Sequence, residues 1–381
     1  MLRIGITGQF GFVGTHLYNY LGLKDDLERI PFQKHFFEDK ILLQNFVKQC
    51  DVIVHLAAMN RHPDINILYQ TNVTLVQTLI EAMKAEDVTP HVIFSSSTQE
   101  DGNNLYGNSK KEGRELFGAW AEKTGATFTG LVIPNVFGPF GKPYYNSAVA
   151  TFCYQLTHNE QPKIVQDATV KLIYVDELTA EIYRIIQDKK SVACCYLPAT
   201  SEIKVTSILA LLNAYKSQYF EKKVFPVFNN RFELNLFNTF RSYIDHLTHY
   251  PVMLKKNTDS RGSFVEIVKT LVGGQFSFST THKNVTRGEH FHTRKIERFA
   301  VISGKAVIEL RRIGTKKILH FELDGENPSF VDMPVWYTHN ITNVGTEDLF
   351  TLFWINEFFD SEDPDTFFEK VTYGINQPRL I

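Results

Sequence analysis

The first half of the chain alternates short apolar runs with longer segments in which apolar residues recur at helical spacing. The runs predicted as strands are Leu2–Thr7, Val52–Leu56, Val92–Ser95 and Phe128–Ile133, and the predicted helices are His16–Leu21, Thr74–Ala85 and Lys110–Lys123. Strands that alternate with helices build a parallel sheet with helices on both faces. The fold class expected for this half is therefore α/β, with a doubly wound parallel sheet.

The pattern changes near residue 245. From there the predicted elements are short strands, namely Phe276–Thr280, Phe299–Ile302, Ala306–Leu310, Lys317–Glu322, Ser329–Asp332 and Leu349–Trp354. Short strands separated by turn signals are typical of an antiparallel all-β barrel or sandwich. We therefore predict two domains, residues 1–245 and residues 246–381.

A glycine-rich turn follows the first predicted strand. Gly8, Gly11 and Gly14 recur as GxxGxxG and open a helix. Such a turn lets the backbone approach a pyrophosphate closely and aims a helix N-terminus at it. We expect a dinucleotide to bind here, with contacts from Gly8, Phe10, Gly11, Phe12 and Val13.

The residue after the second predicted strand, Glu28–Gln33, bears on which dinucleotide binds. An NAD site carries an acid at the tip of this strand to bind the ribose 2′-hydroxyl. This chain has Lys34 there instead, and a cation favours the 2′-phosphate of NADP. We predict NADP(H), with a solvated surface lysine as the alternative.

A serine run and a YxxxK pair follow. The run Ser95-Ser96-Ser97 ends one predicted strand, and Tyr106 and Lys110 lie one helical turn apart on one face. A neighbouring ammonium and the positive nicotinamide of the cofactor lower the pKa of a phenol, so we expect Tyr106 to exchange a proton with a carbonyl oxygen. Lys110 would also hold the cofactor ribose, and Ser97 would bind the substrate oxygen. The alternative is a helix start with a packed tyrosine and a solvated lysine.

The glycine turn, the serine run and the YxxxK pair together resemble the extended short-chain dehydrogenase/reductase family. That family has a Rossmann-type fold and includes nucleotide-sugar epimerases, dehydratases and reductases. Val132 stands where the family usually has an arginine, so that arginine's role is not carried over. The resemblance implies cofactor contacts by Leu56, Ala57, Ala58 and Asn72, and contacts to a nucleotide diphosphate by Asn135, Lys142 and Asn146. An ordinary surface loop is the alternative for residues 142–147.

The C-terminal half carries a cluster of potential metal ligands. Residues two apart on a strand share a face, so His290 and His292 point the same way, and Glu297 and His339 could complete a site. Three imidazoles and a carboxylate suit Zn²⁺, and also Fe²⁺, Mn²⁺ or Ni²⁺. The spacing resembles the motifs of the metal-binding cupin barrels. Trp336 replaces a glycine of the second cupin motif, which alters a turn and not a ligand.

A second resemblance competes for His290. The segments around Arg261 and around Arg287 resemble sugar-nucleotide 3,5-epimerases, cupin-fold enzymes that work without metal and use a histidine base and arginine contacts to the substrate. Arg261 is therefore a candidate substrate contact. Candidates for an epimerase base are His290, Tyr337, His282 and Lys283, and His290 is withdrawn if it binds metal.

Several segments form a further pattern that spans both domains in order, among them Asn60-Arg61, Tyr145-Asn146-Ser147 and Tyr337-Thr338-His339. On these segments the chain resembles, along nearly its whole length, the bifunctional epimerase–reductases of bacterial capsular polysaccharide synthesis. The resemblance implies that the cupin domain epimerises C3 of a UDP-2-acetamido-2,6-dideoxy-4-keto-hexose. The first domain would then reduce the C4 ketone with NADPH, on the route to UDP-N-acetyl-L-fucosamine. The alternatives are a reductase whose cupin domain serves only structure or dimerisation, and a regulator that senses NADP(H) without catalysis.

Composition and charge narrow the possible functional classes of the protein further. The formal net charge is −2, with 40 basic and 42 acidic residues, and no basic stripe points to nucleic acid. The sequence has no apolar run long enough for a membrane span and no signal-peptide pattern. Four cysteines without a CxxC pair fit a reducing cytoplasm. From the resemblance we expect a cytoplasmic homodimer that pairs through the cupin domain.

Overall fold

The structure, a computed structural model, describes residues 1–260 and 262–372. Its contacts divide the chain into two compact units. The first unit comprises residues 1–151 and 164–208, and the second comprises residues 152–163 and the chain from residue 209 onward. The boundary expected at 245–246 separates two sequence domains, and it stays a prediction.

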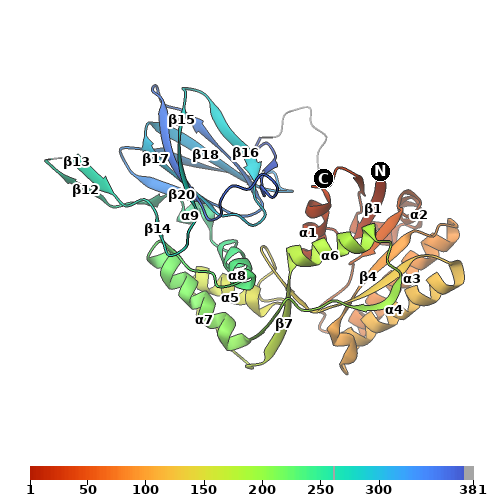
Figure 1. Cartoon of the computed structure of the whole chain (residues 1–381). Helices are drawn as coiled ribbons and strands as arrows, with labels where there is room; N and C mark the ends of the chain where they lie inside the picture. The colour runs from red at the N-terminus through yellow and green to blue at the C-terminus, as the bar shows by residue number, and fades with distance from the viewer. Residues whose placement is uncertain (261, 373–381) are drawn as a thin grey trace. The chain divides into compact units, whose positions relative to one another are not determined.

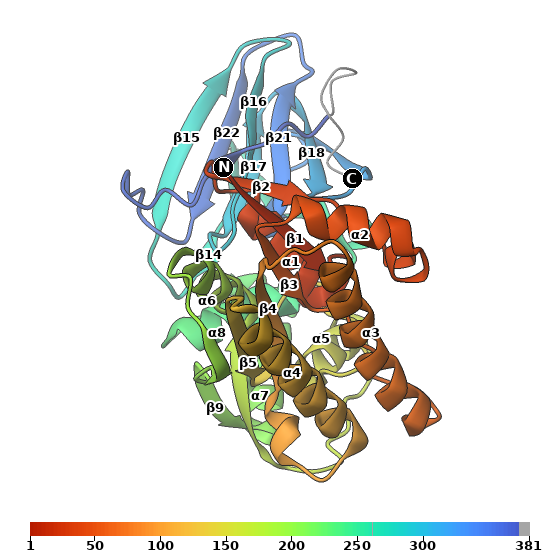
Figure 2. The same ribbon diagram turned by 90° about the vertical axis from the view of Figure 1, so that its right-hand side faces the viewer.

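A six-stranded parallel sheet forms the centre of the first unit (Figures 1 and 2). Its strands, in spatial order, are β2 (Leu27–Ile30), β1 (Leu2–Thr7), β3 (Val52–His55), β4 (His91–Ser97), β5 (Phe128–Ile133) and β8 (Val192–Tyr196). The chain reverses direction across the sheet between β1 and β3, and the carboxyl ends of strands at such a point form a ligand crevice. The prediction of a parallel doubly wound sheet is confirmed.

Helices cover both faces of this sheet. Neighbouring strand residues point to opposite faces, so Ile53 packs in one core and Val52 and Val54 in the other. Figure 2 shows α3 and α4 side by side on one face. The helices on that face are α2 (Lys40–Gln49), α3 (Ile65–Ala85) and α4 (Leu105–Thr124), and those on the other face are α1 (Phe12–Leu21) and α6 (Val175–Gln187).

Two helices begin earlier than the apolar periodicity predicted because polar caps start them. The carboxylate of Asp64 accepts a hydrogen bond from a backbone amide of α3, and the amide oxygen of Asn104 does the same for α4. As a result Tyr106 lies inside the first turn of α4. The second strand is shorter than predicted, and Lys34 lies in the 3₁₀ helix η1 (Lys34–Glu38).

Smaller elements complete the first unit and lead into the second. A three-stranded sheet contains β6 (Asn135–Phe137), β7 (Thr169–Tyr174) and β9 (Ser201–Lys204), and η2 (Thr98–Asp101) follows β4. Helices α5 (Ala148–Thr157) and α7 (Val205–Tyr215) each run across the division between the units. Among the described residues, no helix combines the length and apolar character that crossing a bilayer requires.

Two five-stranded antiparallel sheets form the second unit (Figure 1). One contains β11 (Val252–Met253), β20 (Ser329–Met333), β17 (Glu297–Ser303), β22 (Leu349–Ile355) and β15 (Gln275–Thr281). The other contains β19 (Ile318–Asp324), β18 (Lys305–Arg312), β21 (Tyr337–Asn343), β16 (Thr286–Phe291) and β23 (Phe367–Phe368). Residues of both sheets share one apolar core. The mostly antiparallel β character predicted for the C-terminal part is thus confirmed, and its assignment to the cupin barrels stays a prediction.

The remaining elements of the second unit are short. They are the π-helix η3 (Lys216–Glu221), β10 (Val224–Phe225), α8 (Arg231–Arg241), α9 (His246–His249), β12 (Lys256–Asp259), β13 (Gly262–Val265) and β14 (Lys269–Thr270). Besides the helices, these elements form two small separate ribbons, β12–β13 and β10–β14.

A fully buried ion pair ties η3 to the first of these sheets. Arg298 on β17 makes two bonds to Asp332 on β20, at 2.6 Å and 2.8 Å, and both side chains are almost completely buried. The hydroxyl of Tyr219 in η3 donates to the same carboxylate at 2.7 Å. The Arg298 guanidinium also lies 3.5 Å from the ring centre of Phe330. Such a pair stabilises only while every charge keeps its partner.

We expect Asp332→Ala to lower the free energy of unfolding of the second unit by about 3–5 kcal/mol, because it leaves the Arg298 charge buried and unpaired. Tryptophan fluorescence during urea unfolding would measure this, since Trp336 and Trp354 lie in the second unit. The control is Glu266→Ala, which removes an exposed ion pair with Lys269 and should cost less than about 1 kcal/mol. Equal losses in the two variants would contradict the prediction.

Candidate functional site

The glycine turn packs against the loop after β3 so closely that side chains are excluded. Gly8 has φ +78°, and a Cβ there would lie 2.8 Å from the backbone nitrogen of Ala57. A Cβ on Gly14 would lie 2.1 Å from the carbonyl oxygen of Gly8. The turn therefore presents bare backbone at the N-terminus of α1, which is the arrangement a pyrophosphate needs. These residues fit a dinucleotide.

The other predicted cofactor residues surround this turn. Phe10 and Lys34 are exposed, whereas Phe12, Val13, Leu56, Ala57 and Ala58 are half-buried. Sequence reasoning missed Gln9, whose buried side-chain oxygen accepts a hydrogen bond from the Phe32 amide at 3.1 Å. This bond fixes the glycine turn to the segment after β2.

Asn72 on α3 is buried and connects two parts of the candidate site. Its amide oxygen accepts from the Met59 backbone at 2.6 Å, and its amide nitrogen donates to the Met59 carbonyl and to the Ser109 hydroxyl. Ser109 precedes Lys110 on α4. These bonds hold the loop after β3 against α4, and a direct contact of Asn72 with the cofactor stays a prediction.

The serine run and the YxxxK pair lie on adjoining elements. The hydroxyl of Ser97, at the end of β4, accepts from the Gln99 amide at 3.2 Å. Tyr106 and Lys110 lie on α4, where Lys110 is buried with its ammonium 4.6 Å from the ring centre of Phe94. A Cβ on Gly107 would lie 1.9 Å from the Gln99 carbonyl oxygen. The glycine between the tyrosine and the lysine thus lets α4 approach the loop that carries Ser97.

The direction of the Tyr106 shift expected from the sequence is wrong for this structure. Burial, followed by the nearby Tyr145, raises the pKa of Tyr106 to about 12. Burial also lowers the pKa of Lys110 to about 7, although Glu100 opposes the shift. A lysine that is itself costly to charge does little to make a neighbouring phenol more acidic.

A buried ion pair lies behind this constellation and was not predicted. Glu100 accepts from Arg114 at 2.8 Å and 3.1 Å and also from the hydroxyl of Ser96. Because Ser96 precedes Ser97 and Arg114 lies on α4, the pair holds the serine segment against the helix that carries Tyr106.

The predicted diphosphate contacts lie on the surface of the first unit. Asn135, Lys142 and Asn146 are exposed. The Lys142 ammonium lies 5.3 Å from the ring centre of Tyr145, and the Arg61 guanidinium lies 5.8 Å from the same ring. No role was predicted for Arg61, because only the fold brings two cations to one tyrosine ring. Arg261 lies outside the described residues.

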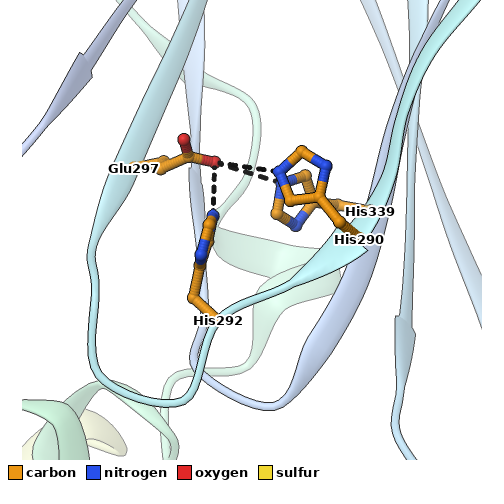
Figure 3. Close-up of side chains that lie close together, drawn as sticks. All are labelled: His290, His292, Glu297 and His339. Atoms are coloured by element: carbon orange, nitrogen blue, oxygen red, sulfur yellow. Dashed lines mark hydrogen bonds and ion pairs between the residues drawn. The ribbon is translucent and has the colours of Figure 1, made fainter. Parts of the chain in front are cut away.

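In the second unit, His290, His292, Glu297 and His339 converge on one point (Figure 3). Their ligand atoms all lie within 4.8 Å of one another. The Nε2 atoms of His292 and His339 are each 3.1 Å from Oε2 of Glu297, and that of His290 is 3.9 Å away. In a tetrahedral zinc site each ligand atom is about 2.1 Å from the ion, so two ligand atoms lie about 3.4 Å from each other. The four residues therefore fit a divalent cation.

A bulge in β16 comes directly before these histidines. Gly288 pairs with Asn340, but His290 pairs with His339, so Glu289 is an extra residue. Glu289 has φ +62° and points outward, where it accepts from the side chain of Asn340 at 3.1 Å. Residues directly opposite each other share a face, and side chains alternate along a strand, so His290 and His292 lie on the face of His339.

The Nδ1 hydrogen bonds of His292 and His339 turn the Nε2 atoms of these two rings towards Oε2 of Glu297, at the point where the cluster converges. Nδ1 of His292 donates to the Asp365 carbonyl at 2.5 Å, and Nδ1 of His339 donates to the Tyr337 carbonyl at 3.3 Å. A carbonyl only accepts, so a neutral ring carries its lone pair on Nε2. Ligand histidines in metal sites are oriented in this way.

Burial and mutual attraction shift the charges of this cluster. Burial alone would raise the pKa of Glu297, but hydrogen bonds from the three imidazoles outweigh it and hold that pKa well below its ordinary value. Burial lowers the pKa of His339 to about 4, against the pull of Glu297. The site thus holds a carboxylate beside at least one neutral imidazole, which is a donor set for a metal ion.

The candidate bases differ in their distance from this cluster. His282 and Lys283 precede β16, at the opposite end of the strand from His290, and the His282 side chain pairs with Asp348. Tyr337 lies two residues before His339 on β21 and so points to the same face. Burial raises the pKa of Tyr337. Its ring packs against that of His246, with 5.2 Å between the ring centres, so His290 is the candidate base that the described contacts place in the cluster.

Both parts of the chain match described families. Residues 4–194 match the NAD dependent epimerase/dehydratase family, and residues 257–367 match the polysaccharide biosynthesis C-terminal domain. The chain is 32% identical over 375 residues to the UDP-2-acetamido-2,6-beta-L-arabino-hexul-4-ose reductase of Pseudomonas aeruginosa, which covers 98% of this chain and all of that protein.

Solved structures agree with this. The capsular polysaccharide assembling protein CapF from Staphylococcus aureus is 34% identical and covers 97% of this chain and 100% of its own, with a TM-score of 0.62. The NADPH complex of RMD from Pseudomonas aeruginosa, 20% identical with a TM-score of 0.52, shares the fold over 57% of this chain and 83% of its own. The chain therefore belongs to the NAD dependent epimerase/dehydratase family, in the two-domain group that includes the UDP-sugar reductase of Pseudomonas aeruginosa and CapF.

Proposed function

We propose that the chain is a bifunctional UDP-sugar enzyme. Its C-terminal cupin domain inverts C3 of a UDP-2-acetamido-2,6-dideoxy-4-keto-hexose, and its first domain reduces the C4 ketone with NADPH. The product lies on the route to UDP-N-acetyl-L-fucosamine. The observation that carries the proposal is the convergence of three imidazoles and a carboxylate in a chain that also holds Tyr106 and Lys110 on one helix turn.

In the reduction, Tyr106 gives its proton to the alkoxide that forms at C4. Its raised pKa suits this direction because the phenol stays protonated until the alkoxide appears. Lys110 holds the ribose of the cofactor, and Ser97 donates to the substrate oxygen. Lys34 makes NADP(H) the preferred cofactor, since its exposed ammonium can pair with a 2′-phosphate.

The nucleotide end of the substrate lies against the surface that Asn135, Lys142 and Asn146 supply. Arg61 is a further contact, because its guanidinium lies over the same Tyr145 ring as the ammonium of Lys142. Arg261 remains the proposed contact of the cupin domain with the sugar nucleotide. Arginine and lysine suit this work because a diphosphate offers several charged acceptors.

In the epimerisation, His290, His292, Glu297 and His339 hold one divalent ion, with Zn²⁺ as first choice. A bound cation polarises a carbonyl and so makes the neighbouring C–H more acidic. If His290 is a ligand, it is not the base. The base that removes the C3 proton is then one of Tyr337, His282 and Lys283, and a protonated group on the opposite face of the sugar returns a proton to C3.

The alternative is a reductase whose C-terminal domain serves only dimerisation. One observation favours a pairing surface in either case: β15 lies at the edge of its sheet and exposes Phe276 and Phe278, the latter by 76%. We propose a homodimer through this domain. The alternative predicts no change in C3 chemistry when the histidine cluster is altered.

We expect Tyr106→Phe to lower the rate of NADPH oxidation with the 4-keto UDP-sugar by about 10²–10⁴-fold, because the proton donor is lost. NADPH binding, measured by fluorescence titration, should persist. The control is Tyr183→Phe on α6, which should keep wild-type turnover. Full turnover by Tyr106→Phe would remove this residue from the mechanism.

We expect His292→Ala to lose the divalent ion and to stop exchange of the C3 proton for deuterium. Elemental analysis and mass spectrometry of the sugar nucleotide in D₂O would measure both effects. The matched control is His320→Ala, since His320 is exposed on β19 and lies outside the cluster. Unchanged exchange in His292→Ala would leave the C-terminal domain without its proposed chemistry.

We expect Lys110→Met to abolish reduction and yet to raise the melting temperature of the cofactor-free protein. Burial lowers the pKa of Lys110 from 10.5 to about 7, so charging this lysine destabilises the folded state. The destabilisation is complete below about pH 7 and disappears as the pH rises towards 10.5.

The difference in melting temperature between wild type and Lys110→Met should therefore be largest at pH 6 and shrink towards pH 10. Thermal unfolding across this range measures it, with the exposed neighbour variant Lys111→Met as the control. A difference that does not depend on pH would show that the buried charge is not its cause.

A further inference from the structure

Asp365 makes an unusual set of contacts close to the histidine cluster. It lies between β22 and β23, its side chain is buried, and its backbone has φ +41°. One carboxylate oxygen accepts from the amide and the hydroxyl of Thr293 at 3.1 Å and 2.6 Å. The other accepts from the amides of Arg294 and Lys295 at 3.0 Å and 2.9 Å. One side chain thus binds three consecutive backbone amides.

These amides belong to the connection between two members of the cluster. Residues 293–296 join His292, at the end of β16, to Glu297, the first residue of β17. A loop of this length could place the two side chains in many relative positions. The carboxylate of Asp365 selects one by fixing three of the four intervening residues.

The backbone of Asp365 acts on His292 directly. Its carbonyl accepts the Nδ1 proton of His292 at 2.5 Å, which fixes both the ring orientation and the tautomer. The segment that follows is held in turn, because Phe367 and Phe368 pair with Phe291 and His290. The same short stretch of chain therefore contacts two of the histidines and the loop beside them.

We propose that Asp365 is a positioning residue of the metal site. Its carboxylate fixes the loop that spaces His292 from Glu297, and its carbonyl sets the Nε2 lone pair of His292 towards the ion. This inference rests on the proposed metal-binding function. Removing a group that orients a metal ligand typically weakens the affinity for the metal 10- to 100-fold.

The experiment titrates Co²⁺ into metal-stripped full-length protein and records both the affinity and the ligand-field absorption spectrum. Asp365→Ala should weaken binding 10- to 100-fold and alter the spectrum at saturation. Asp365→Asn should lie between it and wild type, because asparagine tolerates the positive φ and keeps one acceptor oxygen. The matched control is Glu362→Ala, which removes an exposed carboxylate three residues away and should bind as wild type does.

Two outcomes overturn the inference and are distinguishable. If wild type binds Co²⁺ and both Asp365 variants match it in affinity and spectrum, the positioning role is wrong while the metal site stands. If wild type binds no divalent ion, the proposed metal function itself fails, and the inference falls with it. A purely structural role would lower the melting temperature of the metal-free variants without changing the spectrum. Should Asp365→Ala fail to fold, Asp365→Asn decides the question.

Discussion

The second unit depends on a single electrostatic constraint: the carboxylate of Glu297 is out of water, and three imidazoles point at it. A buried carboxylate is costly unless positive charge or hydrogen-bond donors surround it. Here two of the ring nitrogens lie 3.1 Å from the same oxygen while their other nitrogens are already committed to backbone carbonyls. Lone pairs that converge in this way need protons or a cation between them. The sheet geometry, the bulge and the Asp365 contacts all serve to maintain that convergence.

The first unit obeys a different constraint, which is the distance between backbones. The glycine turn meets the loop after β3, and α4 meets the segment after β4, at separations that leave no room for a Cβ at Gly8 or Gly107. Hydrogen bonds that the side chains of Gln9, Asn72 and Glu100 accept then fix these close approaches. The result is a closely packed frame that holds the phenol of Tyr106 and the buried amine of Lys110 on one turn of α4.

Much of this organisation was predictable from local patterns. Apolar periodicity identified the strands β1, β3, β4 and β5, which depends on residues within a few positions of one another. Spacing together with the resemblance to the cupin motifs identified the four potential metal ligands, although His339 lies 42 positions from Glu297. The predicted second strand ran past the true end of β2, because Phe32 is apolar and buried as strand residues often are, although it lies outside the strand.

Long-range contacts were not predictable in the same way. Asp365 meets residues about seventy positions away, and Arg114 meets Glu100 only because α4 folds back across β4. The predicted direction of the Tyr106 pKa shift was wrong because burial decides that shift, and burial is a property of the whole fold. Residue types suggest a chemistry, and packing determines how readily each group takes up or loses its charge.

The bulge at Glu289 has a consequence for how such a site can change over time. Two residues of β16, Gly288 and Glu289, stand against Asn340 of β21, and His290 stands directly opposite His339. Residues that are directly opposite on neighbouring strands share a face, so loss of Glu289 would straighten the ladder and still leave His290 on the face of His339. The bulge thus absorbs a difference of one residue ahead of the ligands, and related sequences that are one residue shorter here should be compared by their strand pairing and not by their length.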